Sequence, residues 1–171
     1  MRYKYGLLLL CFAISLAALG DEHTSAVAPN AAFDKMKTLD GAWEGNMIEG
    51  GKKYPSTTRF QMVSDGSVLM DWLAEGKPME MVTMFHMNGD ELMATHYCAA
   101  HNQPRFVAVP GADPNRVVFK FKDGTNISSH HGHMQEVTFI FDGPNHHLEE
   151  WTYLDEKGKS STSQFDFQRK K

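Results

Sequence analysis

Short alternating stretches separated by glycine-containing turns run from residue 41 to the end of the chain, and they constrain the fold more than any other feature. Pairs such as Asp65-Gly66 and Asn88-Gly89 are typical of tight hairpins. The predicted strands are Ala42–Ile48, Thr57–Val63, Val68–Ala74, Met79–Met87, Leu92–Cys98, Arg105–Val109, Val117–Lys122, Met134–Phe141, His147–Leu154 and Ser161–Gln168. Because an open meander leaves two unpaired edges, we predict an all-β fold, an antiparallel up-and-down β-barrel of about ten strands after a short N-terminal helix.

The N-terminus has the features of a secretory signal peptide. Arg2 and Lys4 precede an apolar run over residues 7–19, and Ala18-Leu19-Gly20 is a small-residue cleavage site. The run is too short for a comfortable membrane span, so we expect cleavage after residue 20 and an exported, periplasmic or extracellular protein without a membrane span. Residues 21–38 are expected to be a polar lead-in with a short helix near Asn30–Leu39, and residues 39–171 a single barrel domain.

Charge and cysteine content exclude some classes of partner and bond. Loss of Arg2 and Lys4 with the leader changes the formal net charge from −4 to −6, and no basic block remains. This argues against a nucleic-acid partner, because nothing would pair with phosphates. Cys98 is the only cysteine after the leader, so no intramolecular disulfide is expected. A buried small hydrophobe is its simplest role, and a reactive or metal-binding thiol is the alternative.

Alternation along the strands assigns side chains to the barrel interior. A turn at Asn88-Gly89 sets Phe85 opposite Leu92, so His96 and Cys98 are expected to face inward with Leu92. The same alternation predicts that these residues face the barrel interior: Trp43, Met47, Phe60, Met62, Met70, Trp72, Met79, Met81, Thr83, Ala94, Phe119, Phe121, Val137, Phe139, Phe141, Trp151, Tyr153, Phe165 and Phe167. Extending the strand 134–141 backwards adds His133, with His131 as a further candidate. Either Glu149 or Glu150 must also face inward, and an exposed strand end is the expected explanation.

Gly41-x-Trp43, which follows the predicted helix, resembles the signature of the lipocalin and fatty-acid-binding calycin superfamily. The resemblance implies that a basic residue near the end of the last strand packs over the tryptophan, and Arg169 is placed to do so. Gly41–Gly45 with Tyr54-Pro55 is also similar to the opening of nitrobindin-type haem barrels. That family takes its haem ligand from a histidine near the C-terminus, whereas residues 161–171 contain none.

A second resemblance covers most of the mature chain. The segment 81–106, together with Thr125-Asn126, His133-Met134 and Glu149-Glu150-Trp151, resembles a group of uncharacterised secreted bacterial proteins with a lipocalin-like domain. This resemblance implies a fold and an exported location. It implies no activity, because fold alone does not determine function.

Histidines and the cysteine suggest a metal or haem site. His131 and His133 have the spacing that places two imidazoles on one strand face, and His96 and Cys98 share it. If the strands converge, His96, Cys98 and His133 would form a zinc or soft-metal site, or a histidine would ligate haem, as in a metal- or haem-dependent enzyme. The alternative is a solvated loop over residues 130–133. Cys98 and His96 lack an orienting third group, so no catalytic residue is predicted.

The leading hypothesis is a binding protein that holds a small, largely apolar molecule inside the barrel. Its predicted ligand-binding residues are His96, Cys98, Asn102, Arg105, Asn126, His133, Trp72, Phe85 and Trp151. The polar corner Asn102–Arg105 and Asn126 would meet a ligand head group, and turn formation is their simpler role. A third hypothesis is a non-catalytic envelope interaction module with a filled core. No cofactor is predicted beyond these alternatives, and nothing in the pattern specifies an oligomeric state.

Overall fold

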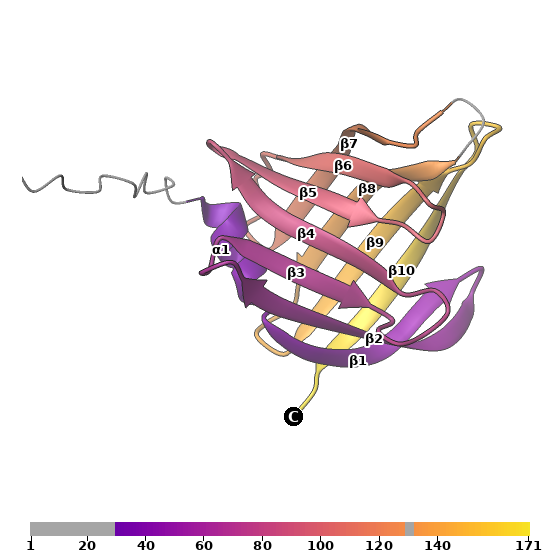
Figure 1. The fold of residues 1–171 in the computed structure, drawn as a ribbon. Coiled ribbons are helices and arrows are strands. Elements are labelled where there is room, and N and C mark those ends of the chain that lie inside the picture. Colours follow the sequence, from indigo (N-terminus) through magenta and orange to yellow (C-terminus); the bar gives the residue numbers. More distant parts are fainter. Residues whose placement is uncertain (1–29, 129–131) are drawn as a thin grey trace, which may run out of the picture.

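Ten antiparallel strands, each paired with its neighbours in sequence, close into a barrel because the first strand also pairs with the last (Figure 1). This computed structural model describes residues 30–128 and 132–171. The elements are α1 (Ala31–Lys37), β1 (Gly41–Glu49), β2 (Lys52–Val63), β3 (Val68–Leu73), β4 (Met81–Asn88), β5 (Glu91–Tyr97), β6 (Gln103–Val109), β7 (Arg116–Thr125), β8 (His133–Phe141), β9 (His146–Leu154) and β10 (Ser160–Arg169). The predicted fold class is confirmed. The predicted signal peptide and His131 lie outside the described residues.

The short helix α1 covers one end of the barrel (Figure 1). Asn30 caps it as expected, since its side-chain oxygen accepts a hydrogen bond from the Phe33 amide at 2.9 Å. Phe33 and Met36 are buried and join the core, so the amphipathic face of the helix seals this end. No helix in the described part of the chain is long and apolar enough to cross a membrane.

The barrel seam between β1 and β10 is fixed beneath this helix by Arg169. Its guanidinium carbon lies 4.1 Å from the centre of the Trp43 ring, as the calycin resemblance implied. The guanidinium also donates hydrogen bonds to the backbone carbonyls of Thr38 at 2.6 Å, Asp40 at 2.7 Å and Pro144 at 3.0 Å. One side chain therefore joins the helix exit, the β8–β9 turn and the seam.

We expect Arg169→Met to lower the free energy of unfolding by about 2 kcal/mol, because three carbonyls lose a charged donor and the indole loses its cation. Arg169→Lys should recover only part of this loss, since an ammonium cannot reproduce the planar fork. Urea unfolding followed by circular dichroism measures both variants. Lys170→Met is the control, because the Lys170 ammonium lies 3.9 Å from the Glu44 carboxylate and both side chains are exposed. Equal losses in the variants at 169 and 170 would contradict this role.

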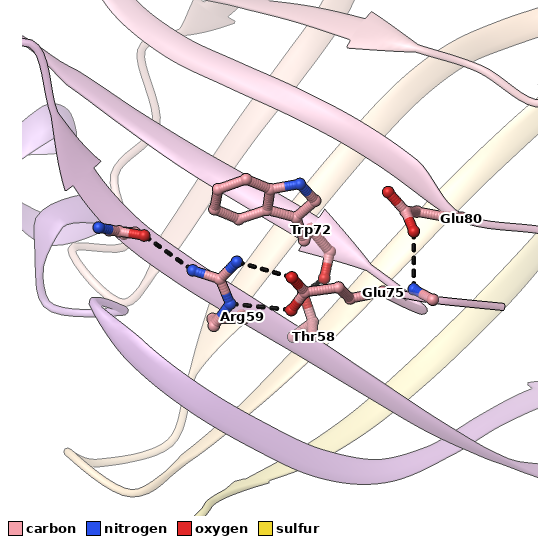
Figure 2. A network of polar contacts seen from close by, with 7 residues as sticks. Thr58, Arg59, Trp72, Glu75 and Glu80 are labelled. Carbon is pink, nitrogen blue, oxygen red and sulfur yellow. Dashed lines mark hydrogen bonds and ion pairs between the residues drawn. The ribbon is translucent and has the colours of Figure 1, made fainter.

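The predicted face of β3 was wrong. Leu69, Asp71 and Leu73 are buried, whereas Met70 and Trp72 lie on the outer face. Trp72 pairs across the sheet with Arg59 of β2, whose guanidinium carbon lies 3.8 Å from the centre of the indole ring. Figure 2 shows this outer cluster, in which Arg59 also forms a double hydrogen bond to the Glu75 carboxylate at 2.8 and 2.9 Å. Trp72 is therefore not a wall of the interior.

Two details of the β4–β5 hairpin also differ from the prediction. Gly89 and Asp90 form the turn, so Phe85 pairs with Ala94 instead of Leu92. This shift by two residues keeps the same faces, and Leu92, Ala94 and His96 are buried as predicted. Met79 precedes β4 and is 62% exposed, so it is not part of the inner wall of that strand.

A β-bulge in β8 changes which residues face inward near its start. The register between β8 and β9 shifts between Met134 and Glu136, which leaves Gln135 unpaired. Simple alternation from Val137 would place His133 inside, but the extra residue reverses the faces before it. Met134 therefore faces the interior, and the His133 ring lies against Phe121, with 4.5 Å between ring centres.

Candidate functional site

A cavity of about 580 Å³ opens at the end of the barrel opposite α1. Its lining residues come from the ends of β1, β3 and β9, from the starts of β2, β4, β8 and β10, and from adjoining loops, including the one that follows β5. They are Met47, Glu49, Tyr54, Pro55, Ser56, Leu73, Ala74, Lys77, Met79, Met81, Cys98, Ala99, Ala100, Met134, Trp151, Tyr153, Ser163 and Phe165. The volume lies within the usual range for small-molecule pockets, and most of the wall is apolar.

The other half of the barrel is filled, so the cavity ends blindly. Phenylalanines from several strands pack edge to face there, with Phe139 in contact with Phe60, Phe85 and Phe119 at ring separations of 6.3, 5.6 and 6.2 Å. All four rings are buried. Phe85 therefore belongs to the packed half and does not line the cavity, contrary to its predicted role as a pocket wall.

A layer of buried polar side chains separates the cavity from this aromatic half. We name it the polar belt: Thr58, Asp71, Thr83, His96 and Glu149, all at most 3% exposed. Each lies two residues deeper along its strand than a residue that lines the cavity, as Asp71 does relative to Leu73 and Glu149 relative to Trp151. The belt is therefore the layer directly below the cavity floor.

Glu149 connects the belt to that floor. Its carboxylate accepts a hydrogen bond from the indole nitrogen of Trp151 at 2.8 Å, and its other oxygen lies 2.9 Å from His147 Nε2. All three side chains are buried. The hydrogen bond fixes one edge of the Trp151 ring, whose surface forms part of the cavity floor. The expectation that the inward glutamate sits at an exposed strand end was wrong.

Asp71 lies on the opposite wall, where the Thr58 hydroxyl donates to its carboxyl group. Burial raises the pKa of Asp71 well above its usual value, the charge of Glu149 raises it further, and the Thr58 hydrogen bond opposes the change. Asp71 also stands directly opposite Thr83 on the neighbouring strand. The belt therefore holds two carboxyl groups out of contact with solvent.

His96 completes the belt next to Thr83. Its Nδ1 lies 2.9 Å from the Thr83 hydroxyl oxygen, and its ring packs against Trp151 with 4.8 Å between ring centres. Burial lowers the pKa of His96 to about 4, so the imidazole is neutral at neutral pH. Its Nε2 is buried and has no hydrogen-bond partner among the residues that the structure describes.

Two of the predicted ligand-binding residues line the cavity, Trp151 and Cys98. Burial raises the pKa of the Cys98 thiol, which hydrogen bonds to the backbone of Ala99 and Ala100 only partly oppose. The thiol is therefore protonated at neutral pH, whereas a nucleophile or metal ligand must be a thiolate. Cys98 thus contributes a small, polarisable, uncharged group to the wall.

The predicted polar corner holds loops together at the barrel end. Asn102 is 1% exposed and donates to the Gly132 carbonyl at 2.9 Å, while Asn126 donates to the His101 carbonyl at 3.2 Å. Arg105 forms a double hydrogen bond to Asp123, at 2.6 and 2.7 Å, on the outer face. None of these three side chains is in the cavity wall.

The proposed metal and haem ligands are not brought together. His96 lies beneath Trp151, Cys98 is in the cavity wall, and His133 packs against Phe121 outside the cavity lining. Across residues 30–128 and 132–171, no group of three or more His, Cys, Asp or Glu side chains is arranged to hold a metal ion. Neither histidine presents a nitrogen to the cavity, where an axial ligand for haem would be needed.

Several residues that define the site were absent from the sequence prediction. Asp71 and Leu73 were missed because β3 was assigned the wrong face. The rim residues Tyr54, Lys77 and Ala99 lie at strand ends or on loops, where alternation gives no information. The register across the tight turn between β2 and β3 would have set Asp71 opposite Phe60, and therefore on the inner face. No comparable signal in the sequence identifies the rim.

Comparison with known proteins assigns no family. No protein-family profile matches the chain, and neither does any curated protein. A protein of unknown function from the DUF3598 family of Nostoc punctiforme has a TM-score of 0.56 and 13% identity, and the match covers 79% of this chain and 48% of that one. This chain thus spans about half the length of the Nostoc protein, and the likeness concerns the fold alone. A structure of EF1p2_mFAP2b bound to DFHBI has a TM-score of 0.41 at 10% identity, covering 80% of this chain and 97% of that one.

Proposed function

We propose that this protein binds a small, largely apolar molecule in the open end of its barrel. The observation that carries the proposal is the blind cavity of about 580 Å³, walled mainly by apolar side chains. A protein interior is normally packed without such voids, so an open apolar cavity of this size is costly unless it is used.

The division of the barrel supports this function. Residues that stabilise the fold gather in the aromatic half and around the seam, whereas the cavity half contributes exposed apolar groups such as Met79, at 62% exposure, and Tyr54, at 45%. Both lie at the cavity mouth. A ligand that enters there would cover surface that is otherwise in contact with water.

The neutral dye Nile red tests the proposal. We expect saturable binding of one dye per protein with a rise in dye fluorescence. Ser56→Phe places a ring in the cavity wall and should weaken binding at least about tenfold. Thr57→Phe adds the same ring to the adjacent exposed position and should leave binding unchanged. Absent saturable binding, or equal affinity in both variants, would overturn the proposal.

We also propose that the protein acts outside the cytoplasm, on the basis of residues 2–20 alone. Fractionation of the cells that produce it, with detection of the mature N-terminus at Asp21, tests this location. Retention of the full-length chain in the cytoplasm would contradict it.

A further inference from the structure

Sulfur atoms are concentrated around the cavity. Four of the eleven methionines line it, together with the Cys98 thiol. These methionines are Met47 on β1, Met79 before β4, Met81 on β4 and Met134 on β8. They come from separate parts of the sheet and converge on one space.

The packed half of the barrel has a different composition. Within the described residues, it holds Met36 in the buried cluster and Met62 and Met87 packed against that cluster, among mainly aromatic and aliphatic side chains. Conversely, Leu73 is the only branched aliphatic residue in the described cavity wall. Methionine as ordinary core filler would be expected in the packed half, where there are gaps to fill. Here four methionines border the open space, compared with three in the packed half.

Aromatic rings complete the cavity wall, some beside the methionines and some across the barrel from them. In a closed ring of ten strands, β4 and β9 are five strands apart, so Met81 and Tyr153 stand on opposite walls. Trp151 and Phe165 extend the aromatic side, and the hydrogen bond to Glu149 holds the Trp151 ring in place. Met47 and Met134 pair across the sheet with Phe165 and Tyr153, so the cavity presents thioethers interleaved with aromatic rings around its wall.

Both kinds of group interact best with flat conjugated molecules. A thioether makes favourable contacts with an aromatic ring, and aromatic side chains add offset or edge-to-face stacking. A flexible alkyl chain gains only apolar burial from the same wall, and it loses chain entropy on binding. Leucine side chains would bury an alkyl chain as well as methionine side chains do.

We propose that the cavity selects a planar, conjugated organic ligand over a flexible aliphatic one, with Met47, Met81 and Met134 as the residues that determine this specificity. The inference rests on the proposed function, because it names the chemical class of the molecule that the cavity holds.

Two neutral alcohols of nearly equal size, 1-pyrenemethanol and 1-hexadecanol, test it by displacement of Nile red. We expect the wild-type protein to bind pyrenemethanol at least about tenfold more tightly. The triple variant Met47→Leu, Met81→Leu, Met134→Leu keeps apolarity and nearly keeps volume. It should weaken pyrenemethanol binding roughly tenfold and change hexadecanol binding less than about twofold.

Met70→Leu with Met84→Leu is the matched control on the outer face of β3 and β4, outside the cavity wall, and both affinities should stay unchanged. Equal or tighter binding of hexadecanol by the wild type would overturn the inference, as would an equal loss for both alcohols in the triple variant. Those results, with Nile red still bound, leave the proposed function intact. Failure of Nile red itself to bind would refute both.

Discussion

Glu149→Ala is expected to lower the free energy of unfolding by about 3–5 kcal/mol, a large fraction of the stability of a domain of this size. The carboxylate is fully buried and is the hydrogen-bond partner of both Trp151 Nε1 and His147 Nε2. Removing it takes away the hydrogen-bond partner of two buried polar groups. Urea unfolding followed by far-ultraviolet circular dichroism measures the loss independently of Trp151.

The adjacent residue provides the control. Glu150 lies on the outer face, where it contacts Arg116 at 3.2 Å and Gln164 at 3.3 Å. Glu150→Ala should change the free energy of unfolding by less than about 1 kcal/mol. A similarly small effect of Glu149→Ala would show that the buried hydrogen bonds contribute little. Glu149→Gln should fall between the two, because it retains an acceptor for Trp151.

Acidification is expected to cost the barrel about 3 kcal/mol through His96 alone. Its pKa is lowered from 6.5 to about 4 by burial, so the folded state holds a neutral imidazole while the unfolded chain takes up a proton. This stabilisation is fully present above about pH 6.5 and is lost as the pH falls toward 4. His96→Gln can keep a hydrogen bond to Thr83 without titrating. Between neutral pH and pH 4, the wild type should therefore lose about 3 kcal/mol more than the variant.

Asp71 makes the opposite contribution to the pH dependence of stability, because burial raises its pKa whereas burial lowers that of His96. Its raised pKa means that the protonated acid is the form suited to the folded state. The corresponding stabilisation is present below its ordinary pKa and is lost as the pH rises through the raised value. Asp71→Asn should thus gain stability relative to the wild type toward higher pH.

Parallel stability curves for the wild type and His96→Gln below pH 6.5 would contradict the role assigned to His96.

Local patterns were sufficient to predict the strands and most inward faces. Glycine turns marked the hairpins, and alternation correctly placed residues such as Phe119, Phe139 and Phe167 inside. These regions have strict periodicity and one buried face, which is the case where alternation is informative. The closure between β1 and β10 also followed from the need to pair both edges.

The errors arose where a polar residue was buried or the strand was irregular. In β3, a tight turn at Asp65-Gly66 already implied that Phe60 stands opposite Asp71, which is the observed pairing. The large apolar side chains of Met70 and Trp72 favoured the other face. Arg59 makes that outer position suitable for Trp72, and such a cation over an indole ring is a tertiary contact that a strand pattern does not reveal.

Prediction of the site failed for a related reason. Placing His133 depended on unbroken alternation through β8, and the bulge at Gln135 has no clear signature in the sequence. The polar corner from Asn102 to Arg105 has the composition of a ligand anchor, but its partners are Gly132 and Asp123. Which polar groups find partners within the protein depends on loop packing, and only the structure determines it.

The pairing of β1 with β10 also has a kinetic consequence. Gly41–Glu49 cannot complete its hydrogen-bonded ladders until Ser160–Arg169 is available, because one neighbour of β1 is the last strand of the barrel. Contacts between residues so distant in sequence slow folding, since much chain entropy is lost before they form. A nascent chain therefore stays open along this seam throughout its synthesis. For a protein that we propose is exported, late closure would keep the chain competent for translocation.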